Sequence, residues 1–318
     1  MPIGLSIRGR QRYLTSSKQI GSGLVFWNEH ARGGSVEMQN WPIGVFTSID
    51  AGLGVKLEVA QELSVPTIQL HAPAKSTRTA ENAASFLQRL ESLDISLTAV
   101  FGGFEGESYD DIPTVAETVG LVPSQTRESR TQEMKEIADF SRLLKCDVVA
   151  LHLGFVPHDP AVPLYSEIVK VTRDLCDHCR ENGQQLNLET GQESADALLQ
   201  FIQDVGEDNL FINFDPANMI LYGTGNPIEA LKKVGQYVRS VHCKDATWAA
   251  NPGEEWGAEV PLGEGDVGME AYLQTLLDIG YHGPLTIERE IAQEPQRQKD
   301  EIGHAVDLLS GLRAKLIG

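Results

Sequence analysis

A strand–helix–strand pattern lies between residues 186 and 216, and it recurs along the chain. Leu186-Asn-Leu-Glu-Thr-Gly191 is a short apolar run that ends in a carboxylate, and Leu210-Phe-Ile-Asn-Phe-Asp-Pro216 is a second one. Between them, Glu193–Val205 carries apolar residues at helical spacing. Short runs of this composition are typical of strands that are buried on both faces, and such strands are joined by helices in parallel sheets. The stretch therefore predicts a parallel α/β fold.

The same alternation extends over the rest of the chain from residue 42. The predicted strands are Gly44–Ile49, Thr67–His71, Leu97–Phe101, Asp147–Leu153, Leu186–Glu189, Leu210–Phe214, Val238–His242 and Pro284–Glu288. The predicted helices are Leu53–Leu63, Thr79–Leu93, Arg127–Leu144, Leu164–Glu181, Glu193–Val205, Pro227–Val234, Met269–Ile279 and Gln296–Lys315. Eight such units predict a single-domain (β/α)8 TIM barrel. The alternative, an open doubly wound sheet, usually has a GxGxxG turn after its first strand, and the residues around Gly54 match that turn poorly.

Composition and charge exclude several classes of protein. The 318 residues include 26 Lys and Arg against 45 Asp and Glu, which gives a net charge of −19, and 41% are hydrophobic. This hydrophobic content excludes wholesale disorder. The acidic balance argues against a nucleic-acid partner and against an anionic membrane surface. No run of about 18 apolar residues predicts a transmembrane helix.

The head of the chain differs from the remainder. Residues 1–37 carry five basic and two acidic side chains and show no apolar period. We expect residues 1–41 to form a flexible extension and residues 42–318 to form the barrel, with a weak likeness to a transit peptide and a start at Met38 as alternatives. Cys176 and Cys179 fall within a helical pattern, and no second pair completes a metal knuckle. With nothing that demands disulfides, we expect a cytoplasmic protein.

Polar side chains gather where strands five to eight end, which is where TIM barrels perform chemistry. Glu189, Asp215, His242 and Glu288 lie at corresponding depths on these four strands. Three carboxylates placed together without a cation would repel one another, and a divalent metal removes that repulsion. Three oxygen ligands and one imidazole favour Mn²⁺, with Mg²⁺, Co²⁺ or Zn²⁺ as alternatives.

These residues resemble those of the sugar isomerase and epimerase family with a xylose-isomerase-like TIM barrel, which includes ketose 3-epimerases and inosose dehydratase relatives. The matching stretches are Leu151–Phe155, Leu188–Gly191, Asn213–Met219, Val241–Asp245, Pro261–Asp266 and Leu285–Glu288. The resemblance implies one metal held by Glu189, Asp215, His242 and Glu288. It also implies that Glu189 and Glu288 act as the catalytic proton-transfer groups on a sugar or sugar phosphate, through a metal-stabilised enediolate. Carbohydrate metabolism is the implied setting.

The chain departs from the family pattern at three points. Asn218 stands where many epimerases have a histidine, and Ala195 stands where the family has a glutamate. Lys244 and Trp248 occupy the loop in which an arginine often follows the strand-seven histidine. These departures leave open whether the reaction is epimerisation, aldose–ketose isomerisation or an inosose-type dehydration. A homo-oligomer is compatible with the sequence, which does not set the oligomeric state.

Further residues are candidates for substrate contact. The candidate substrate-binding residues are His71, His152, Asn218 and Lys244. The loops 102–109 and 262–267 contain glycines and are candidates for closing over the site, with Phe104 stacking on a sugar face.

Two other functions fit the same fold less well. A DNA-repair endonuclease would need more metal ligands and a basic face. A non-catalytic sugar-binding relative would be expected to lose one of the two glutamates, and both are present.

Overall fold

The computed structural model describes residues 41–49, 54–291 and 294–317. All of the predicted extension except Trp41 lies outside these residues, so the division of the chain at residue 41 stays a prediction. Trp41 itself is buried, and its indole N–H donates to the carbonyl of Tyr281 at 2.7 Å. The described part of the chain therefore includes Trp41 in the core of the barrel.

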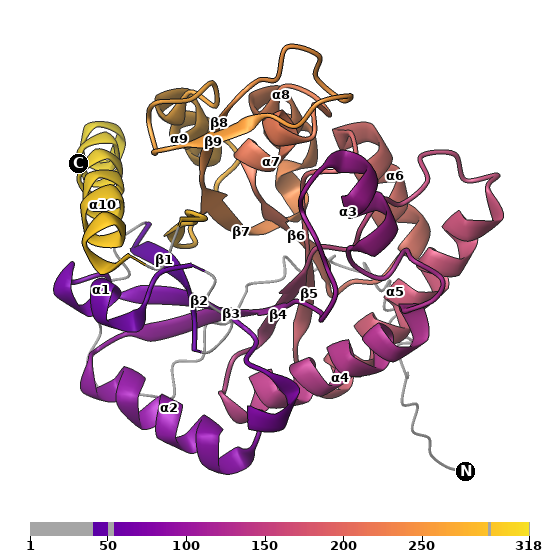
Figure 1. The fold of residues 1–318 in the computed structure, drawn as a ribbon, viewed down its shortest axis with the longest axis horizontal. Helices are drawn as coiled ribbons and strands as arrows, with labels where there is room; N and C mark the ends of the chain where they lie inside the picture. The colour runs from indigo at the N-terminus through magenta and orange to yellow at the C-terminus, as the bar shows by residue number, and fades with distance from the viewer. Residues whose placement is uncertain (1–40, 50–53, 292–293, 318) are drawn as a thin grey trace, which may run out of the picture. The chain divides into compact units, whose positions relative to one another are not determined.

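Eight parallel strands close into a barrel, which confirms the predicted (β/α)8 fold (Figure 1). Around the barrel the strands follow the order β1-β10-β7-β6-β5-β4-β3-β2. Their bounds are β1 Ile43–Ser48, β2 Thr67–His71, β3 Ser96–Gly102, β4 Val148–Leu151, β5 Gln185–Glu189, β6 Leu210–Phe214, β7 Val238–Cys243 and β10 Leu285–Ile287. Every predicted strand is found within about two residues of its expected bounds, as is usual for element ends.

Helices surround the strands, and the last helix lies beside the first (Figure 1). The helices are α1 Leu57–Glu62, α2 Ala80–Ser92, α3 Ile112–Thr118, α4 Arg127–Leu143, α5 Pro163–Glu181, α6 Ala195–Val205, α7 Pro216–Leu221, α8 Pro227–Val234, α9 Met269–Asp278 and α10 Pro295–Ile317. Cys176 and Cys179 are buried in α5 as free thiols, as the helical pattern predicts. Among the helices of the described residues, none is both long and apolar enough to cross a membrane.

Three elements have no counterpart in the predicted alternation. Helix α3 precedes α4 after β3, helix α7 follows β6 directly, and an antiparallel hairpin of β8 (Asp245–Thr247) and β9 (Ala258–Val260) follows β7. All three belong to the segments that follow the C-terminal ends of barrel strands. They are short additions to the repeating unit, and they enlarge the end of the barrel at which the predicted site lies.

The barrel interior carries an unusual layer of polar side chains. Gln69, Asn187, Asn213, Ser240 and Thr286 are buried on five different strands. The Asn187 amide donates to Ser240 at 2.8 Å across β6, so both side chains point inward. Side chains alternate along a strand, so the residue two positions further on points inward again. On each of these strands that residue is also polar. This alternation brings the predicted ligands to the next layer, at the mouth of the barrel.

Candidate metal centre and adjoining cavity

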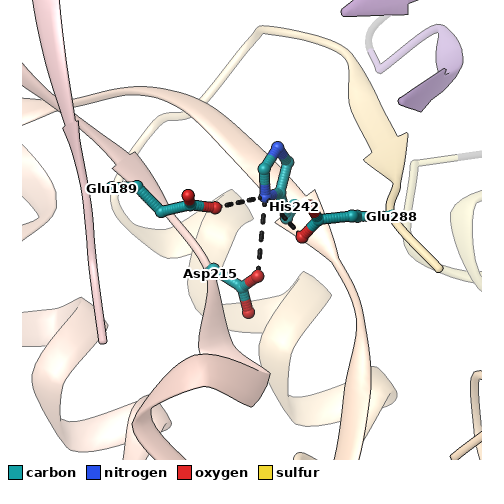
Figure 2. A group of neighbouring side chains, drawn as sticks. All are labelled: Glu189, Asp215, His242 and Glu288. Atoms are coloured by element: carbon teal, nitrogen blue, oxygen red, sulfur yellow. Dashed lines mark ion pairs between the residues drawn. The ribbon is translucent and has the colours of Figure 1, made fainter. Parts of the chain in front are cut away.

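The four predicted metal ligands converge at the C-terminal mouth of the barrel (Figure 2). One ligand atom from each of Glu189, Asp215, His242 and Glu288 lies within 4.8 Å of the other three. His242 Nδ1 is the centre of the group. It lies 2.8 Å from Glu189 Oε1, 3.1 Å from Glu288 Oε2 and 3.5 Å from Asp215 Oδ2. The strand-end prediction therefore identified side chains that meet in space.

Asp215 is oriented by the start of helix α7. Its Oδ1 accepts hydrogen bonds from the backbone N–H groups of Ala217 and Asn218 at 2.8 and 3.0 Å, so it is the N-cap residue. Its backbone N–H donates to the Thr190 hydroxyl at 2.8 Å, which ties the residue to the end of β5. The second carboxylate oxygen, Oδ2, is buried and has no hydrogen-bond donor. One oxygen therefore has a structural role, and the other faces the ligand cluster.

His242 is held so that its Nδ1 faces the cluster. Its Nε2 lies 2.7 Å from Gln69 Oε1, and Gln69 donates its own amide to Asn213 Oδ1 at 3.4 Å. This amide orientation makes Gln69 Oε1 the acceptor for the Nε2 proton, so Nδ1 is the nitrogen left to face the cluster and to bind a metal once its own proton is displaced. Phe101 stacks on the imidazole at a centroid distance of 5.2 Å and fixes the ring plane.

Sequence reasoning did not identify Gln69. A signal for it is present, because Gln69 lies two residues before His71 on the same strand and therefore on the same inward face.

The electrostatics of the metal-free cluster are unfavourable for three carboxylates. Burial raises the pKa of Glu189 to about 7 and also raises the pKa of Asp215. Burial acts in the same direction on Glu288, but Lys244 and His242 outweigh it and hold the pKa of Glu288 below its ordinary value. Glu189 Oε1, Asp215 Oδ2 and His242 Nδ1 are all buried and have no hydrogen-bond partner outside the cluster. A divalent cation fits these three atoms, because it would bind all of them at once after displacing the proton on Nδ1.

A cavity of about 190 Å³ opens next to the cluster and includes Glu189 and Glu288 in its wall. Its aromatic wall is formed by Tyr109, Tyr222 and Trp256, with Tyr222 and Trp256 edge to face at 4.6 Å. Sequence reasoning did not single these three out, because they follow three separate strands and form no local pattern.

Another part of the cavity lining is charged. Lys244 is 2% exposed, and its ammonium lies 3.2 Å from Glu288, 2.9 Å from Glu290 and 3.9 Å from Glu259. Glu259 comes from strand β9 of the hairpin and also binds Arg289 at 2.7 Å. We refer to Lys244, Glu259, Glu288 and Glu290 as the carboxylate wall. The Lys244 ammonium, the one positive charge in this set, is therefore already paired with carboxylates.

All four predicted substrate-contact residues, His71, His152, Asn218 and Lys244, line this cavity. His152 is buried, its Nδ1 lies 2.8 Å from the Gln192 amide, and its Nε2 lies 3.3 Å from the Tyr222 hydroxyl. Burial lowers the pKa of His152 to about 3, so the ring is neutral. Gly103 packs against His71 so closely that a Cβ there would lie 2.3 Å from Nε2. Their contact with substrate stays a prediction.

The predicted stacking residue Phe104 does not line the cavity. Phe104 is buried in the core, and the Arg130 guanidinium lies over its ring at 5.4 Å. Its backbone N–H donates to Glu107, whose other oxygen accepts from Gly120, and this carboxylate folds the loop back on itself. Tyr109 of the same loop lines the cavity instead. The expectation that Phe104 stacks on a sugar is therefore corrected, because the loop turns its ring into the protein.

The loop 262–267 is fastened beside the barrel mouth by one buried carboxylate, Asp245. Asp245 Oδ2 accepts from the N–H groups of Gly263 and Gly265 at 2.9 and 3.1 Å. Its Oδ1 accepts from Val267 at 3.1 Å and Ala246 at 3.0 Å. A Cβ at Gly265 would lie 2.2 Å from Asp245, so glycine is required there. No residue of this loop lines the described cavity, and the hairpin β8–β9 approaches the cavity instead.

Comparison with known proteins agrees with this architecture. Residues 57–311 match the family model described as xylose isomerase-like TIM barrel. The chain belongs to this family. Within it, the crystal structure of a xylose isomerase domain protein from Planctomyces limnophilus is 62% identical and has a TM-score of 0.86, over 87% of this chain and 99% of that one.

More distant structures share the fold alone. An L-ribulose 3-epimerase is 16% identical with a TM-score of 0.65, covering 87% of this chain and 95% of that one. The IOLI protein with a bound zinc atom is 15% identical with a TM-score of 0.66, covering 87% of this chain and 99% of that one.

Among curated proteins, the uncharacterized protein MJ1311 of Methanocaldococcus jannaschii is 25% identical over 187 residues. The match covers 52% of this chain and 59% of MJ1311. The chain thus spans less than two thirds of this relative.

Proposed function

We propose that the protein is a divalent-metal-dependent sugar or cyclitol isomerase, most simply an epimerase. The observation that carries this proposal is the convergence of four ligand atoms within 4.8 Å beside a cavity, with two of the four ligands in the cavity wall. These two, Glu189 and Glu288, approach His242 from opposite sides (Figure 2). Two carboxylates on either side of a substrate carbon are the arrangement that inversion at that carbon needs.

The two glutamates differ in their surroundings. Burial raises the pKa of Glu189 to about 7 when no metal is bound. Glu288 lies 3.2 Å from Lys244 and is held ionised. We propose that one of these glutamates, as the carboxylate, removes the substrate proton and that the other, carrying a proton, delivers it to the opposite face.

A cation fits the ligand set described above, and Glu189, Asp215, His242 and Glu288 would hold it. When bound, a divalent metal supplies Lewis-acid polarisation of a substrate carbonyl. The chain itself supplies the binding surfaces, because the buried side chains of His152, Tyr222 and Lys244 line the cavity and limit where a ring can lie. Mn²⁺ remains our preferred ion, and solved relatives of the same fold contain magnesium or zinc.

Two epimerases among the structures of the same fold support the proposed chemistry. Structures of the same fold include an L-ribulose 3-epimerase and a D-psicose 3-epimerase studied with D-fructose. The same ligands also serve a dehydration that begins with the same proton abstraction, and the product distinguishes the two reactions. The cytoplasmic location, the absence of a nucleic-acid partner and a homo-oligomeric state likewise stay predictions.

The test is exchange of carbon-bound hydrogen with solvent. The full chain, loaded with Mn²⁺, is incubated in D₂O with a panel of ketoses, ketose phosphates and inososes, and deuterium incorporation is followed by NMR. Glu189→Gln and Glu288→Gln are each expected to lower the exchange rate by about 10²- to 10⁴-fold. Glu91→Gln is the matched control, because Glu91 is exposed on α2 and does not line the cavity. Exchange that survives the double substitution would contradict the proposed mechanism.

A further inference from the structure

The proposed function leaves open whether the substrate carries an ionised group, and the cavity walls bear on that question. Among the residues that line the cavity, Lys244 is the only Lys or Arg, whereas Glu107, Glu189, Glu259, Glu288 and Glu290 are acidic. A divalent cation on three ligand carboxylates would still leave that cluster with a net negative charge. A phosphorylated or carboxylated substrate would therefore enter a cavity of its own sign.

The one lysine does not offset this imbalance. Its ammonium is already contacted by Glu288 and Glu290 at 3.2 and 2.9 Å, with Glu259 at 3.9 Å. Arg289 lies behind Glu259 and is engaged by Glu259 and Glu301, each at 2.7 Å. A phosphate bound at Lys244 would lie beside these carboxylates and would be repelled by them. Lys244 remains able to donate a hydrogen bond to a neutral hydroxyl without losing its carboxylate partners.

The backbone N–H groups that would otherwise cradle an anion are also occupied. TIM barrels frequently bind phosphate in the loops after the seventh and eighth strands. Here the glycine-containing loop 262–267 follows the seventh barrel strand, and the N–H groups of Gly263, Gly265 and Val267 all donate to Asp245. At the start of α7, the N–H groups of Ala217 and Asn218 donate to Asp215. In both places a carboxylate of the protein takes the position of an external anion.

The remaining surfaces suit an uncharged polyol. The carboxylate wall presents acceptors that pair with hydroxyl donors, and Asn218 adds an amide. Tyr109, Tyr222 and Trp256 of the same lining offer ring faces and edges on which the C–H face of a sugar can pack.

We infer that the site selects an uncharged polyhydroxylated substrate, a ketose without a phosphate or carboxylate group, and that Glu259 and Glu290 enforce this selection. This inference rests on the proposed function for the identity of the site, but its test measures binding rather than turnover.

The test compares matched pairs of ligands. The Mn²⁺-loaded full chain is titrated calorimetrically with D-fructose, D-tagatose, D-psicose and D-sorbose and with the 6-phosphate of each. We expect at least one free ketose to bind, and its phosphate to bind at least about tenfold more weakly. The ratio of the two dissociation constants should fall as salt is added, because salt screens the repulsion. Glu290→Gln is expected to lower this ratio of dissociation constants at constant salt. Glu91→Gln removes the same charge from the exposed surface of α2 and should leave the ratio unchanged.

The outcomes separate this inference from the proposed function. Phosphates that bind as tightly as the free ketoses, or a panel in which no free ketose binds, would overturn the inference. Deuterium exchange on free and phosphorylated ketoses alike would sustain the function while overturning the selection. Selective binding of a free ketose without exchange would sustain the selection and overturn the function.

Discussion

Two buried aspartates near the mouth of the barrel show how similar side chains acquire different roles. Asp245 follows β7 and accepts four backbone N–H groups, two on each oxygen, which leaves neither oxygen free for a further ligand in the described structure. Asp215 follows β6 and accepts two N–H groups on Oδ1, while its Oδ2 faces Glu189, Glu288 and His242 without a donor. A buried carboxylate satisfied by amides holds a loop. One that faces other carboxylates needs a cation.

The largest effect is expected where the carboxylate is fully satisfied. Asp245→Asn replaces one oxygen by an NH₂ group, so whichever way the amide turns, two backbone donors lose a charged acceptor. We expect the free energy of unfolding to fall by about 3 kcal/mol, since hydrogen bonds to charged groups contribute about 1.5–3 kcal/mol each. Urea denaturation measures this change, and Glu264→Gln on the exposed part of the same loop is the control. Equal stability of the two variants would contradict the structural role of Asp245.

A smaller effect is expected behind the metal ligands. Gln69→Leu removes the acceptor for His242 Nε2–H. Without that acceptor, the ring is no longer held in the tautomer that presents Nδ1 to the cluster. Loss of such a supporting contact typically weakens metal binding by about 10- to 100-fold. Calorimetric titration of the metal-stripped protein with Mn²⁺ measures the change. Gln69→Glu keeps an acceptor and should retain affinity, so equal weakening in both variants would argue against this role.

The pH dependence of metal binding sharpens the comparison further. Burial disfavours the charged imidazole, but Glu288, Glu189 and Asp215 outweigh it and raise the pKa of His242 well above its ordinary value in the metal-free protein. His242 therefore holds a proton that a metal must displace. Below that pKa, Mn²⁺ affinity should rise by about tenfold for each unit of rising pH per displaced proton. An affinity that is constant between about pH 6 and about pH 8 would contradict protonation of the cluster.

The smallest effect is expected for the metal-free stability of Asp215→Asn. The substituted side chain keeps an oxygen for Ala217 and Asn218, and it removes a carboxylate whose pKa is raised by burial. We expect the free energy of unfolding without metal to change by less than about 1 kcal/mol. Thermal unfolding of the metal-stripped protein checks this value. A loss as large as that of Asp245→Asn would show that the two aspartates play the same part.

Much of this molecule can be predicted from local patterns. The apolar runs and helical periods predict all eight barrel strands, because both faces of each strand are buried and the pattern is therefore continuous. Polar residues at strand ends predict the four converging ligands, since parallel strands bring equivalent positions to one mouth. The segments after the strands are less regular. Helix α3, helix α7 and the hairpin β8–β9 break the simple alternation.

What the sequence does not predict depends on contacts between distant segments. Trp256 and Tyr222 meet only because the hairpin after β7 folds over helix α7. Phe104 carries the expected aromatic ring, but Glu107 and Arg130 turn its loop inward, and no local pattern signals that turn. The charge state of Lys244 likewise depends on acids from β9 and from the segment after β10.

The central claim is that the orphaned oxygen of Asp215 belongs to a metal site. Metal-stripped wild-type protein, Glu91→Gln and Asp215→Asn are titrated with Mn²⁺ by calorimetry. We predict one Mn²⁺ per chain for the wild type and for Glu91→Gln, with affinity for Asp215→Asn reduced by at least about 100-fold, because one of four ligands is lost while the fold is kept. Equal stoichiometry and affinity in Asp215→Asn and the wild type would contradict the account.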